Sequence, residues 1–167
     1  MNPENIVNLE QHPIQDEEYA QSCKAQLDST GALVMENYLS ADTVKSLQDE
    51  ARKVRPLAFF CQQNHNAYLL DSDGSLPEDH IRNLEQVSDK GCVPHDQIPD
   101  DSPLRTLYEW SDFRVFLESV LDVPVFPYAD TLSSININYY ERGQQLGWHY
   151  DNASFAITLM VQAPEEG

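Results

Sequence analysis

The chain has 167 residues (19.0 kDa), and 41% of them are hydrophobic, which is enough for an ordinary core. Its formal charge of −18 at pH 7 argues against nucleic acid and membranes as partners, because both present negative charge. The sequence lacks an apolar run of the roughly 18 residues that span a bilayer, and its start does not resemble a secretory signal. Its three cysteines are widely spaced, which fits a reducing compartment. These features predict a cytoplasmic location.

The first third of the chain predicts a loose terminus and two helices. Residues 1–16 are polar and without periodicity, so we expect a disordered N-terminus, followed by a single domain over 17–167. Apolar residues at helical spacing begin after Glu17 and stop at Gly31, which predicts the first helix. Ser40 is a candidate N-cap for a second helix, which Pro56 forces to end.

The middle of the chain predicts short strands, a long loop and two more helices. The apolar runs at 32–35 and 67–70 are typical of strands, and the proline-rich region 75–103 indicates a loop with a short helix near 77–86. A helix is expected over roughly 103–110. Another follows the candidate N-cap Ser111, with an apolar stripe made by Phe113, Phe116, Leu117, Val120 and Leu121.

The last third predicts strands separated by turns. Residues 135–140 alternate in polarity, Gly143 and Gly147 mark a turn, and a second strand carries His149 and Asp151. Residues 155–161 alternate again, and 163–167 have the composition of a further turn.

The His149-x-Asp151 pair is the strongest chemical signal in the sequence. Residues two apart on a strand project to one face, so the imidazole and the carboxylate can reach a common point. These are two of the three ligands in the facial triad that binds non-haem Fe(II). On the neighbouring strand, the polar face with Asn136, Asn138 and Tyr140 would line the same cavity.

The motif Tyr140-x-x-Gly143-x5-His149-x-Asp151 resembles the core of the Fe(II)/2-oxoglutarate-dependent oxygenases, with the spacing of the prolyl-hydroxylase-like branch. A wider part of the sequence is similar to bacterial oxygenases that act on free amino acids, a group that includes radical halogenases. This part consists of His65-Asn66-x-Tyr68-Leu69, 134–140 and 147–159. The resemblance covers roughly residues 17–167. It implies an α+β fold, with N-terminal helices packed on a double-stranded β-helix (jelly-roll) core that is incomplete in this chain.

The resemblance also implies a set of ligands and residue roles. The protein would be a dioxygenase that uses Fe(II), 2-oxoglutarate and O2, with ascorbate as an optional reductant, on a small substrate such as a free amino acid; a homodimer is an open possibility. His149 and Asp151 would be the catalytic metal ligands. The remaining roles fall on Tyr140 and Asn138 for 2-oxoglutarate, and on Arg82, Asn152 and Asn136 for the substrate.

Asp151 bears on the reaction within this family. Its halogenases carry a small residue at the position of this carboxylate, which frees a coordination site for chloride. With Asp151 in place, the resemblance implies hydroxylation rather than halogenation.

One part of the family pattern is missing. The family places a third ligand, a His, and a 2-oxoglutarate-binding Arg or Lys well after the Asp, whereas residues 152–167 contain no His, Lys or Arg. We therefore expect the chain to be the N-terminal portion of an oxygenase, inactive alone; one of the upstream histidines, His12, His65, His80 or His95, is a less favoured third ligand.

Two other readings stay open. The chain could be a non-catalytic acidic interaction or dimerisation module on a decayed oxygenase scaffold. It could also be a cupin-like metal-binding protein, because Gly143-x5-His149 resembles the opening of the cupin signature; cupins, however, have His at the position of Asp151.

Overall fold

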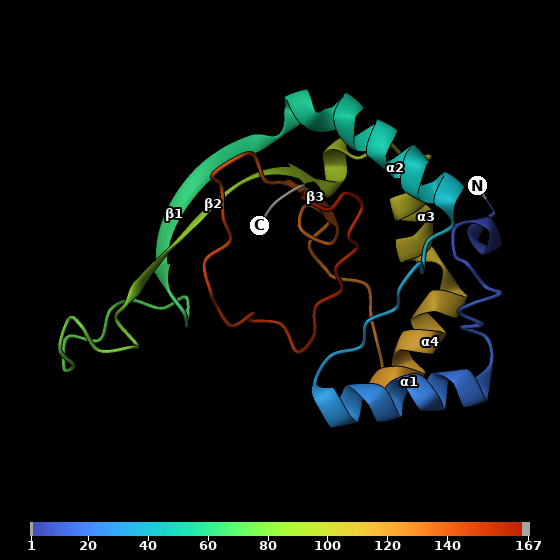
Figure 1. Cartoon of the computed structure of the whole chain (residues 1–167), viewed down its shortest axis with the longest axis horizontal. Coiled ribbons are helices and arrows are strands. Elements are labelled where there is room, and N and C mark those ends of the chain that lie inside the picture. Colours follow the sequence, from blue (N-terminus) through green and yellow to red (C-terminus); the bar gives the residue numbers. More distant parts are fainter. Residues whose placement is uncertain (1, 165–167) are drawn as a thin grey trace. The chain divides into compact units, whose positions relative to one another are not determined.

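The computed structural model describes residues 2–164, among which lie four α-helices and three β-strands (Figure 1). The chain forms two compact units. Residues up to 54 together with 94–136 make the helical unit, and 55–93 together with 137 onward make the strand unit. The helices are α1 (Glu17–Thr30), α2 (Ala41–Val54), α3 (Pro103–Glu109) and α4 (Ser111–Leu121), and the strands are β1 (Phe59–Asn66), β2 (Glu85–Pro94) and β3 (Asn136–Tyr139).

The first two predicted helices are confirmed, with the expected ends. The side chain of Asp16 caps α1 by accepting a hydrogen bond from the amide of Tyr19 at 2.8 Å. Gly31 ends this helix in the left-handed conformation (φ 73°), which glycine adopts without steric cost. Ser40 Oγ accepts from the amide of Thr43 at 3.3 Å and so caps α2, which stops at Val54.

The two later helices are also confirmed, and they complete the helical unit. Ser102 caps α3 by accepting from the amide of Leu104, while α4 begins at Ser111 itself, directly after Trp110. In Figure 1, α4 lies against α1 and α3 lies against α2. The ring of Tyr19 on α1 stacks on Phe116 of α4, with centroids 6.1 Å apart. These apolar helix faces form the core of the unit.

Residues 2–16 pack into the helical unit, where the sequence predicted disorder. Ile6, Val7 and Ile14 are each at most 3% exposed, and Val7 pairs with Leu39 in an isolated β-bridge. His12 is buried too, held by Tyr19 and a backbone carbonyl. Such single apolar residues insert one by one into the core, which leaves no periodicity for a sequence pattern to detect.

The strands come from parts of the sequence that did not predict them. β1 and β2 pair antiparallel, from Phe59 opposite Cys92 to Asn66 opposite Glu85, and the sheet order is β1-β2-β3. The strand predicted at 67–70 is wrong, since these residues form a turn, and the loop predicted over 75–103 contains β2. The run 32–35 and the short helix near 77–86 are likewise absent from the structure as regular elements. β1 and β2 are mostly polar, so they lack the apolar alternation that indicates a strand.

The end of the chain contains fewer strands than predicted. β3 confirms the strand at 135–140, but residues 140–164, all of them described, contain neither the strand expected around 148–151 nor the one at 155–161. The turn expected at 163–167 lies mostly outside the described residues. The described fold is therefore α+β, with a three-stranded sheet. None of the described helices is long and apolar enough to cross a membrane.

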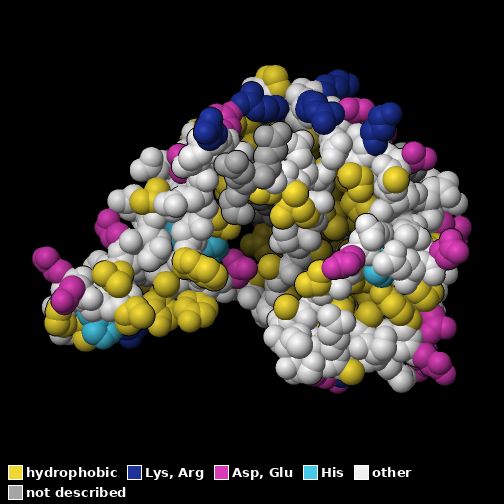
Figure 2. Space-filling view, viewed as in Figure 1, with side chains coloured by type: hydrophobic (Ala, Val, Ile, Leu, Met, Phe, Trp, Pro, Cys, Tyr) yellow, Lys and Arg dark blue, Asp and Glu magenta, His cyan; other side chains and the backbone are white. Residues whose placement is uncertain are grey.

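Charge is unevenly distributed over the helical unit. Figure 2 shows Lys and Arg side chains gathered along α2, which contains Lys45, Arg52 and Lys53. Only 10 of the 167 residues are basic, so this helix holds a large share of the positive charge of an otherwise acidic protein.

Candidate metal centre

His149 and Asp151 converge, as the spacing predicts, although their backbone is not a regular strand. His149 Nε2 lies 3.3 Å from Asp151 Oδ1, and the two side chains are 21% and 57% exposed. The other ring nitrogen, Nδ1, lies 2.7 Å from the carbonyl oxygen of Gly147. A carbonyl can only accept, so Nδ1 carries a proton and donates it, and Nε2 is the ring nitrogen that faces the carboxylate.

This pair fits two neighbouring positions of a metal site. Nitrogen and oxygen ligands with bonds of about 2.1 Å that meet at a right angle are about 3 Å apart, close to the observed separation. A metal-ligating His commonly donates its second N–H to a carbonyl or carboxylate, as His149 does to Gly147. Among residues 2–164, no group of three or more His, Cys, Asp or Glu side chains is arranged to hold a metal ion. Among the described residues, His149 and Asp151 are therefore a candidate pair of ligands.

Backbone contacts hold the segment around this pair against the β1–β2 ribbon. The carbonyl of Gln145 accepts from the amide of Asp89 at 2.8 Å, and the amide of Gly147 donates to Ser88 Oγ at 3.0 Å. Further along, the amide of Tyr150 donates to the carbonyl of Ala67 at 2.8 Å. The segment contacts the ribbon through isolated hydrogen bonds and not through a continuous ladder, so it does not form a regular strand.

His65 lies beside the pair, and its place was not predicted from the sequence. Its ring meets that of His149 edge-on, with centroids 5.7 Å apart and planes at 79°. His65 Nε2 lies 2.7 Å from Ser88 Oγ, and Nδ1 lies 3.0 Å from the carbonyl oxygen of Asn66. Ser88 gave no signal of a role, because β2 is polar along most of its length.

The residues expected near 2-oxoglutarate lie on or just after β3. Asn138 is within β3, and Tyr140 directly follows it with 47% of its surface exposed. Burial raises the pKa of Tyr140 above its usual value, with a smaller contribution from the Cys92 thiol. The phenol can donate a hydrogen bond. Asn136 begins β3 and belongs to the helical unit.

Arg82 joins an aromatic pair next to the ligand segment. Its guanidinium lies over the ring of Tyr68, 5.2 Å from the centroid, and Tyr68 packs on Tyr150 with centroids 5.3 Å apart. Tyr150 lies between the two candidate ligands in the sequence. Arg82 therefore contacts the ligand segment indirectly, through the rings of Tyr68 and Tyr150. Asn152 is exposed, one residue beyond Asp151.

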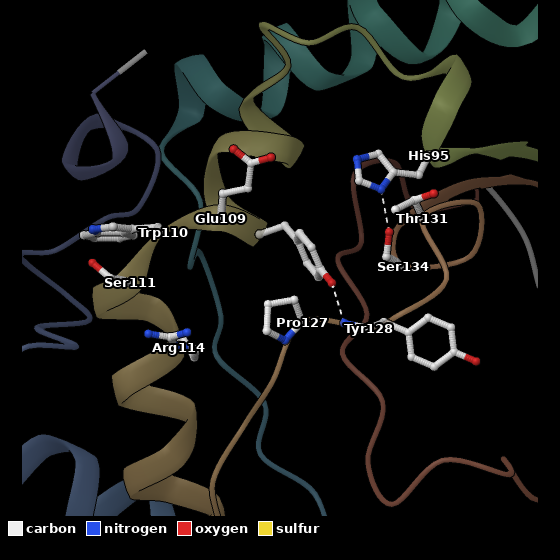
Figure 3. Close-up of a pocket in the computed structure, with 10 residues that line it drawn as sticks. His95, Glu109, Trp110, Ser111, Arg114, Pro127, Tyr128, Thr131 and Ser134 are labelled. Atoms are coloured by element: carbon white, nitrogen blue, oxygen red, sulfur yellow. Dashed lines mark hydrogen bonds between the residues drawn. The ribbon is translucent and has the colours of Figure 1, made fainter.

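The helical unit contains a separate hollow of about 340 Å³ (Figure 3). His95 Nδ1 lies 2.5 Å from Ser134 Oγ, and the amide of Tyr128 donates to the hydroxyl of Tyr108 at 2.9 Å. The buried Nε2 of His95 has no hydrogen-bond partner within the described residues. All the lining residues belong to the helical unit, so the hollow includes neither candidate ligand.

Comparison with known proteins gives one match. The sequence model of the family described as Halogenase D matches residues 14–167, a span that includes the strand unit, most of the helical unit and both candidate ligands. The chain matches no curated protein, and it matches no solved structure. The family match covers far more than half of the sequence. The chain belongs to the Halogenase D family.

Proposed function

We propose that this chain provides two protein ligands of a non-haem Fe(II) centre in a 2-oxoglutarate-dependent oxygenase, and that the reaction is hydroxylation of a small substrate such as a free amino acid. The jelly-roll core expected from the sequence belongs to the same proposal. Membership of the Halogenase D family supports chemistry of the halogenase and oxygenase type. The finer assignment depends on the residues of the strand unit.

The observation that carries the proposal is the geometry of His149 and Asp151. One imidazole nitrogen is fixed by a backbone carbonyl, and the other is 3.3 Å from a half-exposed carboxylate oxygen. Because Nδ1 donates to the carbonyl of Gly147, Nε2 is the ring nitrogen that faces Asp151. In its deprotonated form this nitrogen can bind a metal ion beside the carboxylate.

The residues around the pair have distinct roles in this proposal. His149 and Asp151 hold the iron, which when bound supplies the oxidative decarboxylation of 2-oxoglutarate coupled to oxidation of the substrate. Tyr140 donates a hydrogen bond from its phenol to a 2-oxoglutarate carboxylate. Asn138 is the second residue proposed to contact the co-substrate.

Asp151 favours hydroxylation over halogenation. A halide needs a coordination position of its own, and a carboxylate ligand fills the one that a glycine or alanine would leave open. The carboxylate of Asp151 is within 3.3 Å of the imidazole nitrogen, so it is close enough to share a metal with it. The proposed reaction transfers one oxygen atom of O2 to the substrate and the other to succinate, with release of CO2.

On the substrate side, we propose Arg82 and Asn152 of the strand unit. Arg82 is held over Tyr68, which pre-orients a charge next to the ligand segment. A guanidinium can pair with a carboxylate, the group that every free amino acid carries.

Because the 167 residues alone are expected to be inactive, the experiment incubates a chain completed beyond residue 167 with Fe(II), 2-oxoglutarate, O2, chloride and the proteinogenic amino acids, and analyses the products by mass spectrometry. We expect an amino acid that gains one oxygen, together with an equal amount of succinate. Asp151→Gly should abolish this product, whereas Asp71→Gly, which removes an exposed acid from a loop, should retain it. A chlorinated product from the unmodified protein would contradict hydroxylation, and the absence of both succinate and oxidised product would contradict the whole assignment.

A further inference from the structure

Ser88 and His65 lie on one face of the β1–β2 ribbon, next to the ligand segment. In the antiparallel register His65 is opposite Gln86, so Ser88, two residues further along β2, is its diagonal neighbour. The side chains bridge that diagonal, with His65 Nε2 2.7 Å from Ser88 Oγ.

The direction of each hydrogen bond in this cluster follows from the backbone groups at its ends. The carbonyl of Asn66 can only accept, so His65 Nδ1 donates to it. A neutral imidazole has one N–H, so His65 Nε2 is an acceptor and takes the hydroxyl proton of Ser88. Ser88 Oγ can then accept from the amide of Gly147, 3.0 Å away. The Gly147 amide thus donates to Ser88, Ser88 donates to His65, and His65 donates to the carbonyl of Asn66.

Gly147 connects this cluster to His149. Its amide is fixed by Ser88 and its carbonyl accepts from His149 Nδ1 at 2.7 Å, so both peptide groups that flank its Cα are held. Its backbone also approaches β2 closely, because a Cβ at this position would meet the carbonyl oxygen of Val87 at 2.9 Å and His65 Nε2 at 3.2 Å. The orientation of the His149 ring thus depends on where β2 places Gly147.

We propose that His65 and Ser88 are positioning residues that act through Gly147 to fix the tautomer of His149. With Nδ1 held as the donor, Nε2 stays the ring nitrogen that is directed toward Asp151. This arrangement deepens the proposed function, because a metal ligand needs that nitrogen free; the hydrogen-bond relay itself exists without any metal.

His65 could instead be a third metal ligand, and the contacts argue against that role. Both of its ring nitrogens are already used, by Ser88 and by the carbonyl of Asn66. The rings of His65 and His149 are nearly perpendicular, with centroids 5.7 Å apart. Ligation would break both hydrogen bonds, whereas positioning uses them.

The decisive experiment reads the tautomers of the metal-free protein by long-range proton–nitrogen NMR, at alkaline pH where imidazoles are neutral. We expect both His65 and His149 in the Nδ1–H form, with signals assigned through His65→Gln and His149→Gln. A Nε2–H form at either residue in the unmodified protein would overturn the proposal without any variant.

Substitutions at Ser88 then test the relay. Ser88→Ala should release His149 into a mixture of tautomers and weaken Co(II) binding by about 10- to 100-fold, the usual effect of removing a group that orients a ligand. Ser88→Thr keeps the hydroxyl and should restore the single tautomer. Ser72→Ala, in an exposed turn of the same unit, is the matched control. A folded Ser88→Ala variant with His149 still purely Nδ1–H would overturn the proposal.

Metal binding separates this proposal from the proposed function. Pulsed EPR of the Cu(II) complex counts bound imidazoles: one is expected for positioning, and two would make His65 a ligand and contradict it. If the tautomers are as expected but no metal binds, the relay stands and the iron assignment fails.

Discussion

The backbone of Gly147 approaches Gln86 on β2 so closely that a Cβ on residue 147 would lie 2.8 Å from the Cβ of Gln86. Side chains do not come this near to one another, and the closest atoms belong to the body of β2 rather than to a flexible tip. The absence of a side chain at this position is thus a condition for the path of the segment that carries His149.

Gly147→Ala should therefore move the ligand segment away from β2. We expect a loss of about 1–3 kcal/mol in the free energy of unfolding, typical of overpacking, and weaker Co(II) binding. Urea denaturation and Co(II) titration measure the two effects. Gly74→Ala is the matched control, because nothing lies within 4 Å of a Cβ there. Equal behaviour of the two variants would show that the close approach is unimportant.

Tyr140→Phe tests the contact with 2-oxoglutarate. A hydrogen bond to a charged group contributes about 1.5–3 kcal/mol, so its loss should raise the KM for 2-oxoglutarate by roughly tenfold or more, with little change in metal affinity. Tyr128→Phe, at an exposed tyrosine of the helical unit, should leave this KM unaltered. A KM that stays at the unmodified value in Tyr140→Phe would remove Tyr140 from the co-substrate site.

Glu50 gives the helical unit a pH dependence. Ser102, which is fully buried, donates to Glu50 Oε1 at 2.7 Å, yet burial outweighs this bond and raises the pKa of the Glu50 carboxyl. Folding therefore disfavours the ionised form. The penalty is fully present above the folded-state pKa and disappears as the pH falls below the unfolded-state value.

Glu50→Gln should accordingly stabilise the protein at pH 7. This stabilisation should shrink as the pH falls and the Glu50 carboxyl of the unmodified protein becomes protonated. Thermal unfolding over a pH series measures the difference. Glu10→Gln, at an exposed glutamate, should show no such trend. A destabilised Glu50→Gln protein at neutral pH would mean that the ionised carboxylate is favoured by its partners.

The sequence predicts the helices well, because a helix depends on residues that are close together in the chain. The stripe of α4 and the Gly31 end of α1 are set within one or two turns of chain. β1 and β2 depend on pairing between residues that are 19 to 33 positions apart in the sequence, and their polar composition gives no periodicity that would reveal this pairing.

The same distinction applies to the candidate metal centre. The convergence of His149 and Asp151 follows from two positions in one segment, so the motif alone predicts it. The contact between His65 and Ser88 follows from the register of β1 against β2, which sequence spacing does not contain. Residues that orient a site from another element are found only when the fold is known.

The most direct test of the central claim is absorption spectroscopy of the anaerobic protein with Fe(II) and 2-oxoglutarate. If His149 and Asp151 hold iron that the co-substrate chelates, a metal-to-ligand charge-transfer band should appear in the visible range for the unmodified protein and for His80→Gln, a histidine outside the pair. The band should be lost in His149→Gln. Its absence from the unmodified protein, or its persistence in His149→Gln, would contradict the account.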